Sequence, residues 1–178
     1  MKKLDGRLSW QKPISKIAPC LWFDDQAEDA ANFYVSTFRG CGQEAAIGDI
    51  MRYAASGGPK PKRSVMSATF TLAGQSFIAL NGSPHFTFSP ATSLFVTCVD
   101  QAEVDRFWDG LSEGGQPGRC GWLTDRFGVS WQIVPKTLGA ILQDADRAKS
   151  ERVRRELMGM TKLDLAPLNA AYQGGSAV

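Results

Sequence analysis

The strand-like stretch Cys20-Leu21-Trp22-Phe23 is followed almost at once by Asp25-Gln26-Ala27-Glu28, a sequence typical of a helix start. The same tetrapeptide returns as Asp100-Gln101-Ala102-Glu103, directly after the apolar run of residues 94–99. An aromatic pair follows each copy, Phe33-Tyr34 in the first and Phe107-Trp108 in the second. A strand–helix unit that occurs twice indicates a fold built from two related halves.

Composition predicts a packed globular chain. With 178 residues, of which 43% are hydrophobic and 21% charged, the chain can form one domain or two small modules with a shared core. The formal net charge of +2 is too small to create a strong field, so we expect no nucleic-acid partner. The cysteines Cys20, Cys41, Cys98 and Cys120 form no CxxC pair and no zinc-type cluster.

The sequence also predicts the cellular location of the protein. No apolar stretch approaches the roughly 20 residues that cross a membrane, and no apolar run of the signal-peptide type follows Lys2 and Lys3. We therefore expect a cytoplasmic protein with reduced thiols and no membrane partner.

Periodicity and turn residues divide the chain into segments. Residues 1–16 are predicted to be an N-terminal extension, residues 17–82 a first βαβββ module, residues 83–92 a linker, residues 93–135 a second βαβββ module, residues 136–172 C-terminal helices and residues 173–178 a flexible tail. The linker holds the single histidine, His85, beside Phe86 and Phe88. It could pack its aromatic rings over a core or form a flap over a pocket.

Both predicted helices carry a cap and a buried stripe. Asp24 or Asp25 can cap the first helix, and with Asp25 as the cap Glu28 has the spacing of a capping box, as Glu103 has with Asp100 in the second. The buried stripes are Ala27, Ala30, Ala31, Tyr34 and Phe38 in the first helix, and Val104, Phe107, Trp108 and Leu111 in the second. Asp125 and Arg126 are interpreted as turn residues that fix a hairpin.

Five motifs resemble one known group of proteins. They span residues 19–24, 30–35, 79–82, 120–128 and 130–135, and the run Cys-Gly-Trp-Leu-Thr-Asp-Arg-Phe-Gly at residues 120–128 belongs to the most specific part. The chain resembles the PhnB-like branch of the vicinal oxygen chelate superfamily, whose members include glyoxalases, extradiol dioxygenases and bleomycin-resistance proteins. The resemblance implies an α+β fold in which two βαβββ modules curve a mixed sheet into a cup. Members of this branch often carry the label demethylubiquinone methyltransferase.

The resemblance also implies a metal position, which this chain fills with unsuitable residues. Where the superfamily has His, Gln or Glu ligands, the corresponding positions here are Ala18, Ala79, Ser93 and Gln132. Alanine has no donor atom, and neutral Ser and Gln oxygens are weak ligands for a divalent ion. We therefore expect no metal and no cofactor.

The residues expected to line the cup are mostly apolar or neutral. They are Cys20, Trp22, Phe77, Asn81, Ser93, Phe95, Thr97, Ser130 and Gln132. Trp22 and Phe95 would stack on a ligand, while Asn81, Ser93 and Gln132 would orient it. Cys20 is a candidate nucleophile, but the sequence places no cation or histidine beside it, which favours an inert thiol.

The predicted function is metal-free binding or sequestration of a small, partly apolar molecule by a homodimer, which the open sheet edges favour. No catalytic residue is assigned, and whether the chain is an enzyme stays open. One alternative is a metal-dependent enzyme of the glyoxalase or dioxygenase class with ligands elsewhere, and another is an oligomerising protein with a filled cup. Methyl transfer from S-adenosylmethionine is not favoured, because no glycine-rich turn joins a predicted strand to a helix.

Overall fold

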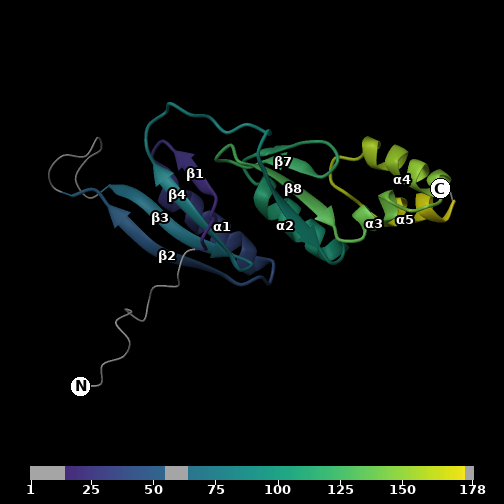
Figure 1. Cartoon of the computed structure of the whole chain (residues 1–178), viewed down its shortest axis with the longest axis horizontal. Coiled ribbons are helices and arrows are strands. Elements are labelled where there is room, and N and C mark those ends of the chain that lie inside the picture. The colour runs from purple at the N-terminus through teal and green to yellow at the C-terminus, as the bar shows by residue number, and fades with distance from the viewer. Residues whose placement is uncertain (1–14, 55–63, 175–178) are drawn as a thin grey trace, which may run out of the picture. The chain divides into compact units, whose positions relative to one another are not determined.

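The structure, a computed structural model, describes residues 15–54 and 64–174 of the chain (Figure 1). It confirms the predicted α+β class: two four-stranded mixed sheets, each open at its edges, are accompanied by helices at the C-terminal end. The chain divides into two compact units between Phe86 and Thr87, inside the segment predicted to link the modules. In the described ranges, no helix combines the length and apolar character required to cross a membrane.

The N-terminal unit contains β1 (Cys20–Phe23), α1 (Ala27–Gly40), β2 (Ala45–Arg52), β3 (Val65–Leu72) and β4 (Gln75–Asn81). Its strand order is β1-β4-β3-β2, with β1 parallel to β4 and the other pairs antiparallel. Helix α1 packs on one face of this sheet, and the predicted stripe along it is buried. Aromatic rings fill the interior: Phe70 stacks on Phe77 at a centroid distance of 5.1 Å, and Tyr34 lies 5.9 Å from Phe70.

The C-terminal unit repeats the arrangement with β5 (Ser93–Cys98), α2 (Gln101–Ser112), β6 (Gln116–Pro117), β7 (Trp122–Thr124) and β8 (Ser130–Pro135). The strand order β5-β8-β7-β6 is the same order as in the first sheet, again with one parallel pair, β5 with β8. The predicted stripe of α2 is buried, and it faces a sheet side that presents Trp131 and Ile133. The duplication expected from the repeated tetrapeptide is therefore present in the fold.

The two helices begin differently, although their sequences match. Asp100 caps α2 as predicted, since its carboxylate accepts the N–H of Glu103 at 2.8 Å, and Glu103 accepts the N–H of Val99. The predicted cap by Asp25 is wrong: the N-cap position of α1 is Gln26, and no side chain there caps the helix. The amide oxygen of Asn81, at the end of β4, accepts the N–H of Ala27 at 2.8 Å instead.

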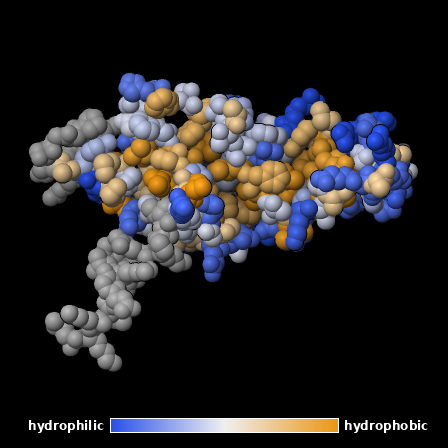
Figure 2. Space-filling model, viewed as in Figure 1, coloured by the Kyte–Doolittle hydropathy of each residue, from blue (hydrophilic) through white to orange (hydrophobic). Residues whose placement is uncertain are grey.

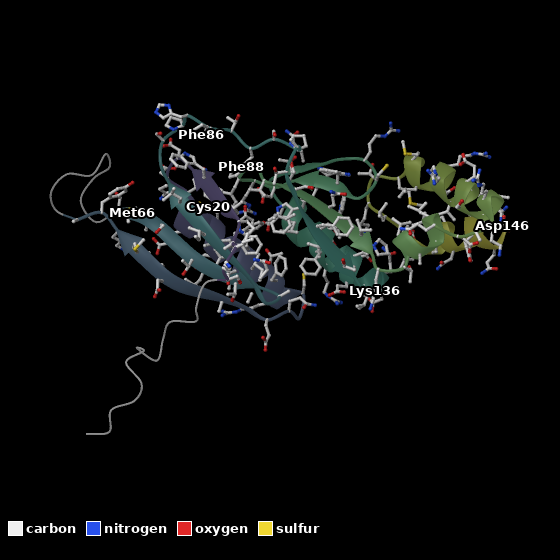
Figure 3. All side chains as sticks on the ribbon, viewed as in Figure 1. Cys20, Met66, Phe86, Phe88, Lys136 and Asp146 are labelled. Atoms are coloured by element: carbon white, nitrogen blue, oxygen red, sulfur yellow. The ribbon has the colours of Figure 1, made fainter. Side chains whose placement is uncertain are left out.

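Three further helices complete the C-terminal unit: α3 (Leu138–Leu142), α4 (Arg147–Gly159) and α5 (Leu165–Gln173). Leu138, Val153, Leu163 and Leu168 form their common apolar core. Lys136 marks where the chain leaves the sheet, and Asp146 lies at the start of α4 (Figure 3), where its carboxylate caps the helix. Hydrophilic residues dominate the surface over this helix in Figure 2. The predicted helical C-terminal region is confirmed.

Candidate functional site

One face of the C-terminal sheet is not covered by α2 and carries most of the predicted site residues. Ser93, Phe95 and Thr97 alternate along β5, and the register pairs Ser93 with Ser130 and Phe95 with Gln132 on β8. The side-chain amide of Gln132 donates a hydrogen bond of 2.8 Å to the Ser93 hydroxyl. The Phe95 side chain is 58% exposed. Five predicted residues therefore share one face, although Ser130 is buried there.

Trp122 is a residue of this face that sequence reasoning did not select. It lies opposite Gln132 in the β7–β8 pairing, so its half-buried indole is on the same side of the sheet. It belongs to the run of residues 120–128 that carries the family resemblance. The alternation of β7 would have placed it on this face once Gln132 was assigned there.

In the N-terminal unit, Cys20 and Trp22 lie on the sheet face opposite α1, because Leu21 and Phe23 are buried on the helix side. The Trp22 indole N–H donates to the carbonyl of Ser83 at 2.9 Å, and its ring meets Phe86 edge-on at a centroid distance of 5.3 Å. A Cβ on Gly82 would lie 1.9 Å from the Trp22 ring. The indole therefore rests directly on the chain at Gly82, which no larger residue would permit.

Phe77 and Asn81 are corrections to the predicted site, since both face α1 rather than the open side. Phe77 stacks within the core, and Asn81 bonds Ala27 together with the backbone carbonyls of Asp25 and Val65. The physical reason is the parallel register, which pairs Cys20 with Ile78 and Trp22 with Leu80. Ile78 and Leu80 therefore stand where the sequence placed Phe77 and Asn81.

The segment after β4 divides its aromatic residues. Phe86 packs against Trp22 but remains 66% exposed (Figure 3). Phe88 belongs to the C-terminal unit, where its ring lies near Gly128. His85 is exposed. The contact of Phe86 with Trp22 is that of a loop that packs an aromatic ring on its own unit.

Cys20 has the environment of an ordinary thiol. Partial burial raises the pKa of the Cys20 thiol above its usual 9.0, with desolvation as the cause. A reactive cysteine requires the opposite shift, produced by a neighbouring cation or imidazole. The thiol is therefore poorly suited to nucleophilic catalysis at neutral pH.

The residues at the family's metal positions do not fit a metal. Ala79 is fully buried on the helix side of its sheet, and neither Ala79 nor Ala18 has a donor atom. Ser93 and Gln132 hydrogen-bond each other and contribute only neutral groups. Over residues 15–54 and 64–174, no three His, Cys, Asp or Glu side chains gather closely enough to hold an ion. A hard divalent cation prefers anionic or imidazole ligands, which this set does not provide.

Comparisons with known proteins agree with this fold. Residues 15–134 match the family model for 3-demethylubiquinone-9 3-methyltransferase. A PhnB protein from Bacillus cereus, proposed in its name to be such a methyltransferase, is 38% identical, with a TM-score of 0.61 over 68% of this chain and 99% of its own. Protein PA1353 from Pseudomonas aeruginosa is 24% identical, with a TM-score of 0.54 over 67% and 96% of the two chains, and supports the fold alone.

No curated protein sequence matches the chain. The family model nevertheless spans more than half of its length, and the Bacillus cereus protein is matched over almost its whole length. The chain therefore belongs to the 3-demethylubiquinone-9 3-methyltransferase family, the PhnB-like group that its sequence motifs resemble.

Proposed function

We propose that this protein binds or sequesters a small, partly aromatic molecule without a metal, in the cytoplasm and as a homodimer. The observation that carries the proposal is the hydrogen-bonded pair of Gln132 and Ser93 beside the exposed Phe95 ring. The Ser93 hydroxyl keeps its own proton to donate, and the amide oxygen of Gln132 can accept. A flat apolar surface next to a neutral donor and acceptor suits an aromatic ligand that carries carbonyl or hydroxyl groups.

The family's name refers to 3-demethylubiquinone, and a quinone ring has this chemistry. Its ring would stack on Phe95 and its oxygens would hydrogen-bond to Ser93 and Gln132. A neutral site accepts such a molecule without the desolvation of a buried charge. Binding of the ring does not require methyl transfer, for which the two mixed sheets offer no glycine-rich strand-to-helix turn.

The proposed homodimer is supported by the sheet edges. In the strand orders β1-β4-β3-β2 and β5-β8-β7-β6, the outer strands β2 and β6 each pair on one side within the described chain. Edge strands present unpaired backbone groups, which another copy could satisfy. Light scattering coupled to size exclusion would give the mass, and a monomer at working concentration would refute the dimer.

Calorimetric titration with a fully substituted dimethoxy-dimethyl-benzoquinone tests the binding, because this ring has no free position at which a thiol could add. Gln132→Ala should weaken binding roughly tenfold through the lost hydrogen bonds, while the melting temperature changes little. Gln116→Ala is the matched control, since Gln116 is exposed on β6. Absence of binding, or equal affinity in both variants, would refute the proposed site.

The same titration separates the alternatives. Affinity that disappears after chelator treatment would favour a metal-dependent enzyme. Binding of S-adenosylmethionine by the untreated protein would favour the hypothesis that the protein is a methyltransferase. Affinity for the quinone that survives chelation, with no response to S-adenosylmethionine, supports metal-free binding.

A further inference from the structure

The N-terminal unit has a recess where the end of α1, the start of β2 and the β3–β4 turn meet. Its volume is about 500 Å³, within the range of small-molecule sites. Its lining includes one cation, one carboxylate and several neutral polar groups: Arg39, Glu44, Gln43, Thr71, Ser76 and Ser15. We call it the polar pocket. Thr71 and Ser76 lie on the sheet face opposite α1, the face that also carries Cys20 and Trp22.

Backbone hydrogen bonds fix the walls of the polar pocket. After α1, Gly42 adopts a φ of 81° and donates to the carbonyl of Arg39, while Gln43 donates to that of Phe38. This closing turn returns the chain into β2. The carbonyl of Glu44 then accepts the N–H of Ala73, which holds the β3–β4 turn in place at 2.8 Å. The pocket is therefore built from ordered elements.

The floor of the pocket is a row of small side chains. Ala46, Thr71 and Ser76 lie side by side on β2, β3 and β4. Ser76 is buried, and its hydroxyl is the hydrogen-bond partner of Ser15 at 3.3 Å. Because the side chain of Ala46 is a single methyl group, the pocket above it stays open, whereas a longer side chain at this position would fill it.

The two charges on the walls retain unused bonding capacity. Arg39 donates from Nε to the Ala45 carbonyl at 2.8 Å, which leaves the terminal guanidinium nitrogens for another acceptor. The Glu44 carboxylate forms no ion pair or hydrogen bond with any residue in the described ranges. One positive and one negative group therefore line the same cavity, and both can still form hydrogen bonds or ion pairs with a ligand.

We propose that the polar pocket binds a small zwitterion, such as a free amino acid. Arg39 would hold the carboxylate of the ligand, Glu44 its ammonium group, and the hydroxyls of Thr71 and Ser76 its remaining polar atoms. A simple anion would meet the charge of Glu44, and a simple cation that of Arg39. Only a ligand with both charges satisfies both walls.

The test is an NMR titration of the full chain with glycine and with L-serine, with acetate and methylammonium as singly charged comparisons. Both amino acids should shift the backbone amides of Gln43, Thr71 and Gly74 in a saturable way, and the comparison ions should not. Amides that do not move with either amino acid, or that respond equally to acetate alone, would overturn the proposal.

Variants assign the binding to the pocket. Arg39→Met and Glu44→Gln should each weaken amino-acid binding roughly tenfold or more. The matched controls Arg155→Met and Glu151→Gln, on the exposed side of α4, should bind as the unchanged protein does. Arg39→Met also removes the bond to Ala45, so Ala46→Leu provides a second test that fills the pocket from its floor. Unchanged affinity in Ala46→Leu and Glu44→Gln would refute the site.

Discussion

At the scale of single residues, Asp125 shows how one carboxylate can hold a hairpin. The side chain is only 3% exposed. One of its oxygens accepts the N–H groups of Phe127 and Val129 at 2.8 and 3.0 Å, and the other accepts the indole N–H of Trp131 at 2.8 Å. Buried N–H groups require a partner, and a charged acceptor binds them more strongly than a neutral one. Asp125 thus orients the start of β8, the strand that carries Gln132.

Asp125→Ala should lower the free energy of unfolding by roughly 2–5 kcal/mol, because two buried donors and one partly buried donor lose their acceptor. Urea unfolding followed by circular dichroism measures the change. Asp109→Ala, a surface carboxylate on α2, is the control and should stay within about 0.5 kcal/mol of the unchanged protein. A small effect of Asp125→Ala would mean that water satisfies these donors as well as the carboxylate does.

Single-residue predictions from the sequence succeeded where periodicity decides them. The buried stripes of both helices were confirmed, and so was the turn role of Asp125. Phe77 and Asn81 were placed on the wrong face, because strand alternation defines two faces but does not say which one meets the helix. The pairing of Cys20 with Ile78, which decides it, joins residues far apart in sequence.

At the scale of elements, the start of α1 depends on a residue of another element. Asn81 is buried at the end of β4, accepts the N–H of Ala27, and donates to the carbonyls of Asp25 and Val65. One side chain therefore joins α1, β3 and β4. Local sequence could not predict this cap, because the capping-box pattern of Asp25 and Glu28 is complete without it.

Asn81→Ala should destabilise the protein by roughly 2–4 kcal/mol, since it removes the cap and leaves buried backbone groups unpaired. Asp25→Ala is a sharp comparison, because the sequence pattern assigns the cap to Asp25. It should change the free energy of unfolding by less than about 0.5 kcal/mol. Chemical denaturation of both variants gives the two values. A larger loss of stability in Asp25→Ala than in Asn81→Ala would show that Asp25 is the cap after all.

A second link between elements depends on pH. The Tyr172 hydroxyl at the end of α5 donates to Asp144, before α4, at 2.5 Å, and Lys149 lies over the Tyr172 ring. The hydrogen bond lowers the pKa of Asp144 below its ordinary 3.8 and raises the pKa of Tyr172 above 10.0. The hydrogen bond between Tyr172 and Asp144 therefore stabilises the fold fully between the two ordinary pKa values, that is, between pH 3.8 and pH 10.0. It weakens as the pH falls through the lowered pKa of Asp144 or rises through the raised pKa of Tyr172.

Tyr172→Phe should lower the melting temperature by a constant amount between about pH 5 and pH 9, and the difference from the unchanged protein should shrink in acid as Asp144 is protonated. Tyr53→Phe is the control, because the Tyr53 hydroxyl donates to the backbone carbonyl of Asn81, which does not titrate in this range. Thermal melts at a series of pH values show the trend. A Tyr172→Phe difference that stays constant down to the acid limit would exclude Asp144 as the relevant partner.

At the scale of the whole molecule, the family-matched region ends before the C-terminal helices. The family model covers residues 15–134, whereas α3, α4 and α5 lie beyond it. They are nevertheless joined to the C-terminal unit. Gln101 donates to the carbonyl of Leu163 and accepts the N–H of Leu165, while Cys120 and Gly121 donate to the carbonyls of Met160 and Thr161. The second copy of the repeated tetrapeptide thus supplies one of the residues that bond the C-terminal helices to the rest of the unit.

Leu163 connects these helices to the sheet, since it is fully buried in their core and lies against Gly121. Leu163→Ala should cost roughly 2–5 kcal/mol through the cavity it leaves. Because each unit has its own core, hydrogen exchange should accelerate in α3, α4 and α5 while β1, β3 and β4 keep their protection. Met158→Ala, at an exposed position on α4, should leave both patterns unchanged. Faster exchange throughout the N-terminal unit of Leu163→Ala would show instead that the two units unfold as one.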